Sequence, residues 1–319
     1  MSALPSLRQL GYLVEVADRL NFRAAAEASF VTQSTLSAGI KELESLLGVE
    51  LVERDPRGAR LTAAGEEVAK RARTVLASAH DLVDSARGAG KPLDGIFRLG
   101  VIPTVAPFLL SGVTSKLRGE YPGLRLHLRE DLTERLLERL RGGDLDGALI
   151  ALPFDTAELA VTELFEDEFW FVARDDDPNA TKKEMLVRDL EPGSVVLLEE
   201  GHCLRDHAIA ACGTRGARAK AVLEATSLTT LIQMVEGGLG VTLLPELTLK
   251  AGILRGTRLI ARPFSSHVPS RTVALVSRPA GARRADVELL AAFFQRHYRE
   301  QSKIRPASRR KTGLAKVAR

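Results

Sequence analysis

The chain has 319 residues, 45% hydrophobic and 27% charged, which is ordinary globular composition; at roughly 150 residues per domain it predicts two domains and permits three. No apolar stretch approaches the roughly 20 residues of a membrane span, and the N-terminus lacks a secretory signal. These features exclude collagen, coiled-coil rods, disulfide scaffolds and membrane proteins, and they predict a cytoplasmic location. Of 45 basic residues, seven follow Glu300, so residues 1–302 hold 38 basic against 41 acidic, or −3.

The net charge of +4 is therefore carried by a C-terminal tail, 303–319. A tail with a run of like charges is usually disordered and solvated. Weak, salt-sensitive contact with nucleic acid is the alternative interpretation of this tail.

The first ninety residues show helical spacing of apolar residues. The predicted elements, in chain order, are a helix containing Leu7 to Ala17, a helix Phe22–Ala28 capped by Asn21, a helix Gln33–Leu47 capped by Thr32, a hairpin within 50–61, and a helix that starts after Thr62. A short helix, a tight turn, a second helix with a polar start and a basic hairpin together predict a winged helix-turn-helix.

Polar residues at the start of the second helix of that motif suit base edges in the major groove, since amides and hydroxyls bond bases and phosphates. Basic residues in the hairpin suit the DNA backbone or the minor groove. The alternative is an ordinary capped helix. Net charge does not indicate DNA binding, because the first 95 residues hold 12 basic and 13 acidic residues. The candidate DNA-binding residues are Gln33, Ser34, Thr35, Ser37, Lys41, Arg54 and Arg57.

The helix after Thr62 also carries a heptad seam, because small apolar residues recur at spacings of 4, 3, 4, 3 and 4. This regularity favours pairing with a second helix, and hence a dimer, over packing on its own domain. The seam residues are Val68, Ala72, Val75, Ala79, Leu82 and Ala86.

A glycine- and proline-containing segment, 88–92, marks a linker, after which strands and helices alternate. Alternation of this kind predicts βαβ units and a parallel sheet. The predicted strands are 95–102, 124–129, 147–152, 168–174, 195–198, 241–244 and 271–278, and the predicted helices are 109–120, 132–141 and 284–298.

The only cysteines are Cys203 and Cys212. They are either two ordinary buried thiols or a redox pair, since cytosolic proteins seldom keep structural disulfides. Cys203 lies between His202 and Arg205, and a cation together with a helix start favours the reactive thiolate. If 204–211 is helical, nine residues place the two cysteines on opposite faces, so a disulfide requires unwinding.

Five ordered blocks resemble the LysR-type transcriptional regulators. This resemblance implies an α/β fold class: a winged helix-turn-helix, a dimerising linker helix and a periplasmic-binding-protein-like regulatory domain of two α/β subdomains. The blocks are 22–27, 32–37, 40–44, 47–54 and 61–65. The expected domains are 1–62 for DNA binding, 63–90 for the linker helix, 91–302 for the regulatory domain (subdomain I, 92–166 and 268–302; subdomain II, 167–267), and 303–319 for the tail.

Within that family, the segment Gly201 to Asp206 with a second cysteine nine residues on, the segment 102–107, and the pairs 271–272 and 278–279 resemble the OxyR branch, the hydrogen-peroxide-sensing regulators. The resemblance implies that Cys203 is peroxidatic and Cys212 resolving. By the same resemblance, four residues match positions near the reactive thiol: Thr104, Thr133, His202 and Arg271. Arg205, the positively charged neighbour of Cys203, completes the candidate reactive site. Alternatively, Thr104 caps a helix and Arg271 pairs with a carboxylate.

The resulting hypothesis is a DNA-binding regulator of antioxidant genes, and not an enzyme, with no cofactor and no metal. The expected partners are promoter DNA, RNA polymerase, hydrogen peroxide, a thiol reductant system and copies of itself in a homodimer or homotetramer; no membrane is expected. Two rival hypotheses are a LysR-type regulator with a small-molecule effector in the interdomain cleft, and a thiol peroxidase. Ala38 and Gly39 need not match the family's commoner residues, which leaves the operator sequence open.

Overall fold

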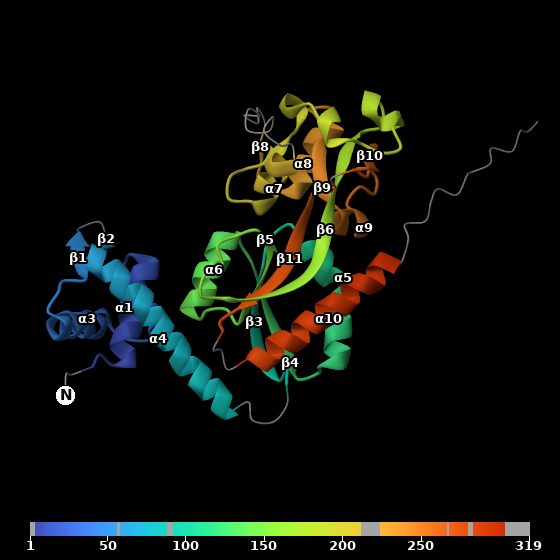
Figure 1. Cartoon of the computed structure of the whole chain (residues 1–319). Coiled ribbons are helices and arrows are strands. Elements are labelled where there is room, and N and C mark those ends of the chain that lie inside the picture. The colour runs from blue at the N-terminus through green and yellow to red at the C-terminus, as the bar shows by residue number, and fades with distance from the viewer. Residues whose placement is uncertain are drawn as a thin grey trace, which may run out of the picture.

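The computed structural model describes residues 4–55, 58–87, 92–211, 224–266, 268–279 and 283–303. Figure 1 shows a small N-terminal unit, one long helix leaving it, and a larger part with a lower and an upper subdomain. The helices are α1 Leu7–Arg19, α2 Phe22–Ala28, α3 Gln33–Leu47, α4 Ala63–Arg87, α5 Ala106–Glu120, α6 Thr133–Gly142, α7 Cys203–Ala211, α8 Leu228–Glu236, α9 Glu246–Lys250 and α10 Arg284–Lys303. The strands are β1 Val52–Asp55, β2 Gly58–Leu61, β3 Gly95–Val101, β4 Leu124–Glu130, β5 Gly147–Leu152, β6 Ala160–Arg174, β7 Leu197–Leu198, β8 Glu224–Ala225, β9 Thr242–Pro245, β10 Leu259–Arg262 and β11 Ser270–Ser277.

Helices of the N-terminal unit begin where side chains can satisfy their first backbone N–H groups. The Asn21 side chain accepts hydrogen bonds at the start of α2, and Thr32 accepts from the N–H of Thr35 at 3.2 Å. Thr62 accepts from the N–H of Gly65 at 3.0 Å at the start of α4. Each such cap stabilises its helix by about 1 kcal/mol. The predicted helices and the antiparallel hairpin of β1 and β2 are confirmed.

Helix α3 lies directly against α1 because Gly39 has no side chain. A Cβ at this position would come within 2.7 Å of the Tyr12 ring. Leu36, Ile40 and Leu43 are buried on the same side of α3. The helix therefore presents its polar face outward, held at a fixed distance from α1.

The long helix α4 contacts α1 and β2 of the N-terminal unit and α6 of the lower subdomain. Its first turns pack on α1, where Ala72 is buried in the core of the N-terminal unit. The predicted seam is therefore wrong at Ala72, which faces its own domain, and Val68 packs against the same core. Val75 and Leu82 remain 47% and 71% exposed, whereas the side chain of Ala86 lies outside the described part. Two exposed apolar side chains one heptad apart still suit helix pairing.

The central sheet is mixed rather than parallel. Strands β3, β4 and β5 are parallel, as the βαβ pattern predicted. β11 runs antiparallel to both β5 and β6, and β9 and β10 run antiparallel to β6. The prediction of a parallel sheet is thus correct only for the strands joined by helical crossovers.

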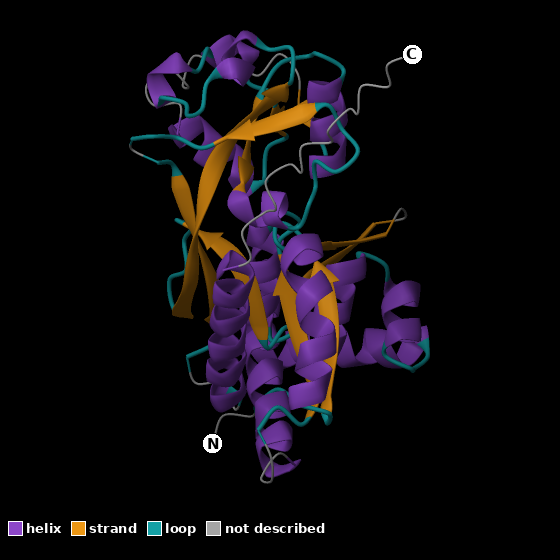
Figure 2. Ribbon diagram, turned by 90° about the vertical axis from the view of Figure 1, so that its right-hand side faces the viewer, coloured by secondary structure: helices purple, strands orange, loops and turns teal. Residues whose placement is uncertain are grey.

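Strand β6 is twice as long as predicted and connects the two subdomains. Its first part, Ala160 to Glu168, pairs with β11, and its last part, Phe169 to Arg174, pairs with β9 and β10. Figures 1 and 2 show β6 and β11 side by side, rising from the lower to the upper subdomain. Each subdomain has its own apolar core.

Helix α7 lies between those two cores. Its first residue, Cys203, belongs to the core of the lower subdomain, whereas Leu204 and Ala208 belong to the core of the upper one. The helix spans Cys203 to Ala211, in agreement with the predicted helix. Cys212 lies outside the described residues. Within the described part of the chain, no helix is long and apolar enough to cross a membrane.

The exposed face of α4 generates a prediction about assembly. Leu82→Asp or Val75→Asp would bury a charge in any helix pair formed there, so the dimer should weaken by at least about tenfold, because an unpaired buried charge costs several kcal/mol. Sedimentation equilibrium measures this. Thr74→Asp, on another exposed face of α4, is the control and should leave the dimer unchanged. Equal dimer stability in all three variants would contradict the seam.

Candidate functional site

The candidate DNA-binding residues lie on the outward face of α3. Gln33, Ser34, Thr35 and Lys41 are exposed, and Ser37 is half-buried. The hydroxyl of Thr32 lies 2.9 Å from that of Ser34 and 2.8 Å from that of Thr35. Hydroxyls and an amide are therefore clustered at the first turn of an exposed helix. Arg54 is in β1, but its side chain and the whole of Arg57 lie outside the described residues.

A second group of predicted residues converges around Cys203. Thr133 is the first residue of α6, Thr104 lies just before α5, and Arg271 lies in β11. All four side chains are buried, with Thr104, Thr133 and Arg271 each 1% exposed and Cys203 7% exposed. Their elements come from distant parts of the sequence, so the tertiary fold alone brings these groups together.

Arg271 is the charged centre of this group. Its guanidinium donates to Asp167 Oδ2 from Nε at 3.1 Å and from Nη2 at 2.9 Å. Nη1 donates to the hydroxyl of Thr104 at 2.7 Å, and Nη2 to the carbonyl of Thr104 at 3.3 Å. Both alternatives for Arg271 therefore hold: it pairs with a carboxylate and it lies beside the thiol. Thr104 does not cap α5, whose N-cap, Val105, makes no side-chain bond.

The Cys203 thiol experiences opposing effects. Burial raises its pKa above the ordinary value, while the charge of Arg271 and a hydrogen bond with Thr133 oppose that rise. The hydroxyl of Thr133 has no other hydrogen-bond partner among the described residues. The prediction of a lowered thiol pKa is wrong for this conformation, in which desolvation dominates.

The sequence neighbours expected to activate the thiol act elsewhere. Arg205 donates to the carbonyl of Leu198 at 3.0 Å and to Glu224 at 2.6 Å. Burial lowers the pKa of His202, and Glu199 at 3.9 Å opposes this only in part. His202 is therefore a neutral imidazole at pH 7. The cation that acts on Cys203 is Arg271, which is distant in sequence.

Two further residues belong to the site although the sequence did not single them out. Asp167 is fully buried and also accepts from the N–H of Leu247 at 2.9 Å. Burial raises its pKa, against the opposing charge of Arg271. His207, one turn after Cys203 on α7, has Nε2 2.9 Å from the carbonyl oxygen of Leu152. Burial and the charge of Arg271 lower the pKa of His207.

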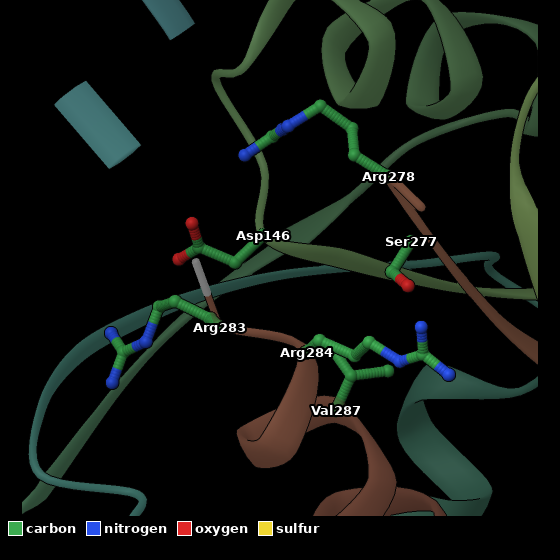
Figure 3. Close-up of a pocket in the computed structure, with 6 residues that line it drawn as sticks. All are labelled: Asp146, Ser277, Arg278, Arg283, Arg284 and Val287. Carbon is green, nitrogen blue, oxygen red and sulfur yellow. The ribbon is translucent and has the colours of Figure 1, made fainter. Parts of the chain in front are cut away.

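A small pocket at the far end of the lower subdomain is a different kind of site. Figure 3 shows arginine side chains around the Asp146 carboxylate. The space measures about 10 Å³, which is room for at most one water. The guanidinium of Arg278 donates to the carbonyls of Leu140 and Leu145. The pocket is thus a structural cluster of charged side chains. Among the described ranges, no group of three or more His, Cys, Asp or Glu residues could hold a metal ion.

Comparison with known proteins identifies the class to which this fold and this site belong. Residues 7–66 match the model for the bacterial regulatory helix-turn-helix protein, lysR family, and residues 90–299 match the LysR substrate binding domain. The chain therefore belongs to the LysR-type transcriptional regulators and, within them, to the OxyR branch. Proteins of this family regulate transcription and are generally not enzymes.

The relatives cover almost the whole chain. The HTH-type transcriptional regulator EstR of Acinetobacter baylyi is 43% identical over 93% of this chain and 98% of its own. A probable hydrogen peroxide-inducible genes activator of Streptomyces viridosporus is 40% identical over 93% and 95%. The solved structure of full-length OxyR from Pseudomonas aeruginosa, carrying a cysteine-to-aspartate substitution, is 34% identical, covers 92% of this chain and 95% of its own, and has a TM-score of 0.77.

The buried ion pair generates a stability prediction. Asp167→Asn removes the partner of a fully buried guanidinium, so the free energy of unfolding should fall by about 3–5 kcal/mol. Asp175→Asn is the control, because its partner Arg258 is 62% exposed; it should cost no more than about 1 kcal/mol. Urea unfolding of the reduced protein measures both. Equal losses would show that the buried pair has no special role.

The thiol generates a pH prediction. Because burial raises its pKa, labelling of Cys203 by iodoacetamide should rise with pH at a higher midpoint than that of a free cysteine. Thr133→Val removes a hydrogen bond that favours the thiolate, so the midpoint should move further up. The measurement uses a Cys212→Ser background, with Thr114→Val as the control. A midpoint below that of free cysteine would contradict the dominance of burial.

Proposed function

We propose that this protein is a DNA-binding regulator that senses hydrogen peroxide through Cys203. One observation carries the proposal: a buried thiol beside the hydroxyl of Thr133 and near the guanidinium of Arg271. Hydroxyl groups and a guanidinium suit a small molecule with two O–H groups, because they can orient it and stabilise the oxygen that leaves. The similarity to a peroxide-inducible activator supports the same conclusion.

The first chemical step consumes one peroxide. The Cys203 thiolate attacks one oxygen of H₂O₂, the O–O bond breaks, and a sulfenic acid forms at Cys203. The oxygen that leaves takes up the proton that the thiol released, so the products are sulfenic acid and water. Arg271 and the Thr133 hydroxyl stabilise two anions in this step, the Cys203 thiolate and the oxygen that leaves. Thr104 keeps Arg271 in position through its 2.7 Å hydrogen bond.

The second step forms the disulfide with Cys212. The Cys212 thiol displaces hydroxide from the sulfenic acid, an S–S bond forms, and a second water is released. Two electrons from each thiol pair have then reduced one peroxide to two waters. A thiol reductant system of the cell returns the pair to the reduced state.

Helix α7 prevents that bond while it is intact. Eight residue steps separate Cys203 from Ala211, a rise of about 12 Å. The residue after Ala211 adds at most about 3.8 Å, so its Cα cannot come closer than about 8 Å to that of Cys203. A disulfide requires about 7 Å or less. Oxidation must therefore unwind part of α7.

Unwinding α7 breaks contacts on both sides of the helix. The upper subdomain loses the Arg205 bonds to Leu198 and Glu224, and the link to the lower subdomain through His207 and Leu152 is broken. A rearrangement at the boundary of the two subdomains is the kind of change that can move a linked DNA-binding unit. We infer that promoter contacts, and through them RNA polymerase and the transcription of antioxidant genes, respond to this change.

DNA recognition is assigned to α3 and the hairpin, in a homodimer or homotetramer that places two copies on one operator. Gln33 is exposed at the first turn of α3. Gln33→Ala should lose about 1–3 kcal/mol of discrimination at one base position, whereas Arg57→Ala should weaken binding to all sequences and reduce the salt dependence. Titration of operator and random DNA at several salt concentrations measures both. Equal loss on both DNAs would assign Gln33 to the backbone instead.

The switch is tested by a pair of cysteine variants. Cys203→Ser should abolish the peroxide response while leaving the fold and the reduced-state footprint on the protein's own upstream region intact. Cys212→Ser should still form sulfenic acid at Cys203 but should not lock it, so further oxidation follows. Mass spectrometry after a brief peroxide pulse measures the species. Equal oxidation of the two cysteines in the wild-type protein would contradict the assigned roles.

A turnover assay separates a sensor from a thiol peroxidase. A sensor consumes about one peroxide per thiol pair and then waits for reduction, whereas a peroxidase with excess reductant consumes many. Sustained peroxide consumption at a rate set by the reductant would contradict the regulatory assignment.

A further inference from the structure

Helix α6 begins at the thiol site. Its first residue, Thr133, forms the hydrogen bond that acts on the Cys203 thiol. The preceding residue, Leu132, packs on Gly201, where a Cβ would lie 3.0 Å from Leu132 Cδ1. Gly201 has φ of +92°, a backbone conformation that favours glycine. The N-terminal end of α6 therefore contacts both Cys203 and the turn that precedes it.

The other end of α6 lies against the linker helix α4. At Gly143, the residue that ends α6, a Cβ would lie 2.1 Å from the Cβ of Ala77. At Gly142 a Cβ would lie 3.1 Å from Cδ of Arg73. Ala77 is 3% exposed. Two consecutive glycines thus allow the end of α6 to meet the Arg73 and Ala77 side chains of α4 with no side chain of α6 between them.

Between these ends α6 is held firmly on the sheet. Leu136, Leu137 and Leu140 are buried at 0%, 1% and 0% exposure. Gly100 in β3 leaves the space that Leu136 fills. Ten residues give a length of about 15 Å. A short helix packed this closely moves as a unit, because a close-packed interior transmits displacement instead of absorbing it.

The contact with α4 continues into the N-terminal unit. Arg73, whose side chain lies beside Gly142, forms an ion pair with Asp18 of α1 at 2.5 Å. Ala72, its neighbour, is buried in the core of that unit. A movement of the end of α6 would therefore act on residues that also fix the angle between α4 and the DNA-binding helices.

We propose that α6 transmits the redox state of Cys203 to the linker helix α4, through Thr133 at one end and the Gly142–Gly143 contact with Arg73 and Ala77 at the other. The inference rests on the proposed function, since the first event is the oxidation of Cys203. When Cys203 leaves Thr133 to form the disulfide, α6 loses its contacts at one end, and its position against α4 changes. Coupling of this kind is reciprocal: DNA bound by the N-terminal units changes the ease of oxidation at Cys203.

The test inserts a wedge at the far end of this path. Ala77→Leu forces α4 and α6 apart, about 15 Å from the thiol along the length of α6. Sulfenic acid formation at Cys203 should proceed within about twofold of the wild-type rate, whereas the difference in operator affinity between reduced and oxidised protein should fall by about fivefold or more. Thr74→Leu adds the same side chain on an exposed face of α4, and the affinity difference should be preserved.

Hydrogen exchange on the unaltered protein is the second measurement, and it does not depend on how the variant folds. Oxidation should change protection at the C-terminal end of α6 and in α4 around residues 73–77. Unchanged protection there, or an Ala77→Leu protein that switches its footprint like the wild type, would overturn the inference while leaving peroxide sensing intact. If Cys203 of the wild-type protein is not oxidised, the proposed function itself fails.

Discussion

The arrangement of the reactive site depends on one buried ion pair, Arg271 with Asp167. Both side chains are fully excluded from solvent, and removing two charges from water costs several kcal/mol for each ion. The cost is offset only because the hydrogen bonds are nearly complete: Thr104 accepts from the guanidinium, and the N–H of Leu247 donates to the carboxylate. The pair therefore fixes β6, β11 and the starts of α5 and α9 relative to one another.

The same pair places a permanent positive charge near a buried thiol. Burial keeps Cys203 protonated, and a permanent positive charge nearby stabilises the thiolate whenever the proton leaves. A guanidinium suits this role because it stays charged at every physiological pH. A histidine in its place would lose its charge on burial, as His202 does.

Features encoded by neighbouring residues could be predicted from the sequence. Asn21 and Thr32 cap the helices that they precede, because capping depends on the next three residues. The Cys203 helix was likewise bounded by local signals. Long-range features could not be foreseen: Asp167 meets Arg271 across 104 positions, and β6 runs through two subdomains. The pKa direction of Cys203 was missed because the burial that raises it is set by the tertiary fold. In addition, Arg205, its neighbour in sequence, extends to Glu224.

The position of α7 between two cores has a consequence for the threshold of the response. Cys203 is anchored in the lower core while Leu204 and Ala208 are anchored in the upper one, so the proposed disulfide would compete with the local folding free energy of nine residues. That free energy depends on residues that never touch peroxide, such as Ala208 and Ala210. Exchanging a good helix former for a poor one there alters it by up to about 1 kcal/mol. In the proposed switch, substitutions in α7 would therefore reset the oxidant dose that triggers the protein, and make that dose depend on temperature, without altering the chemistry at the sulfur.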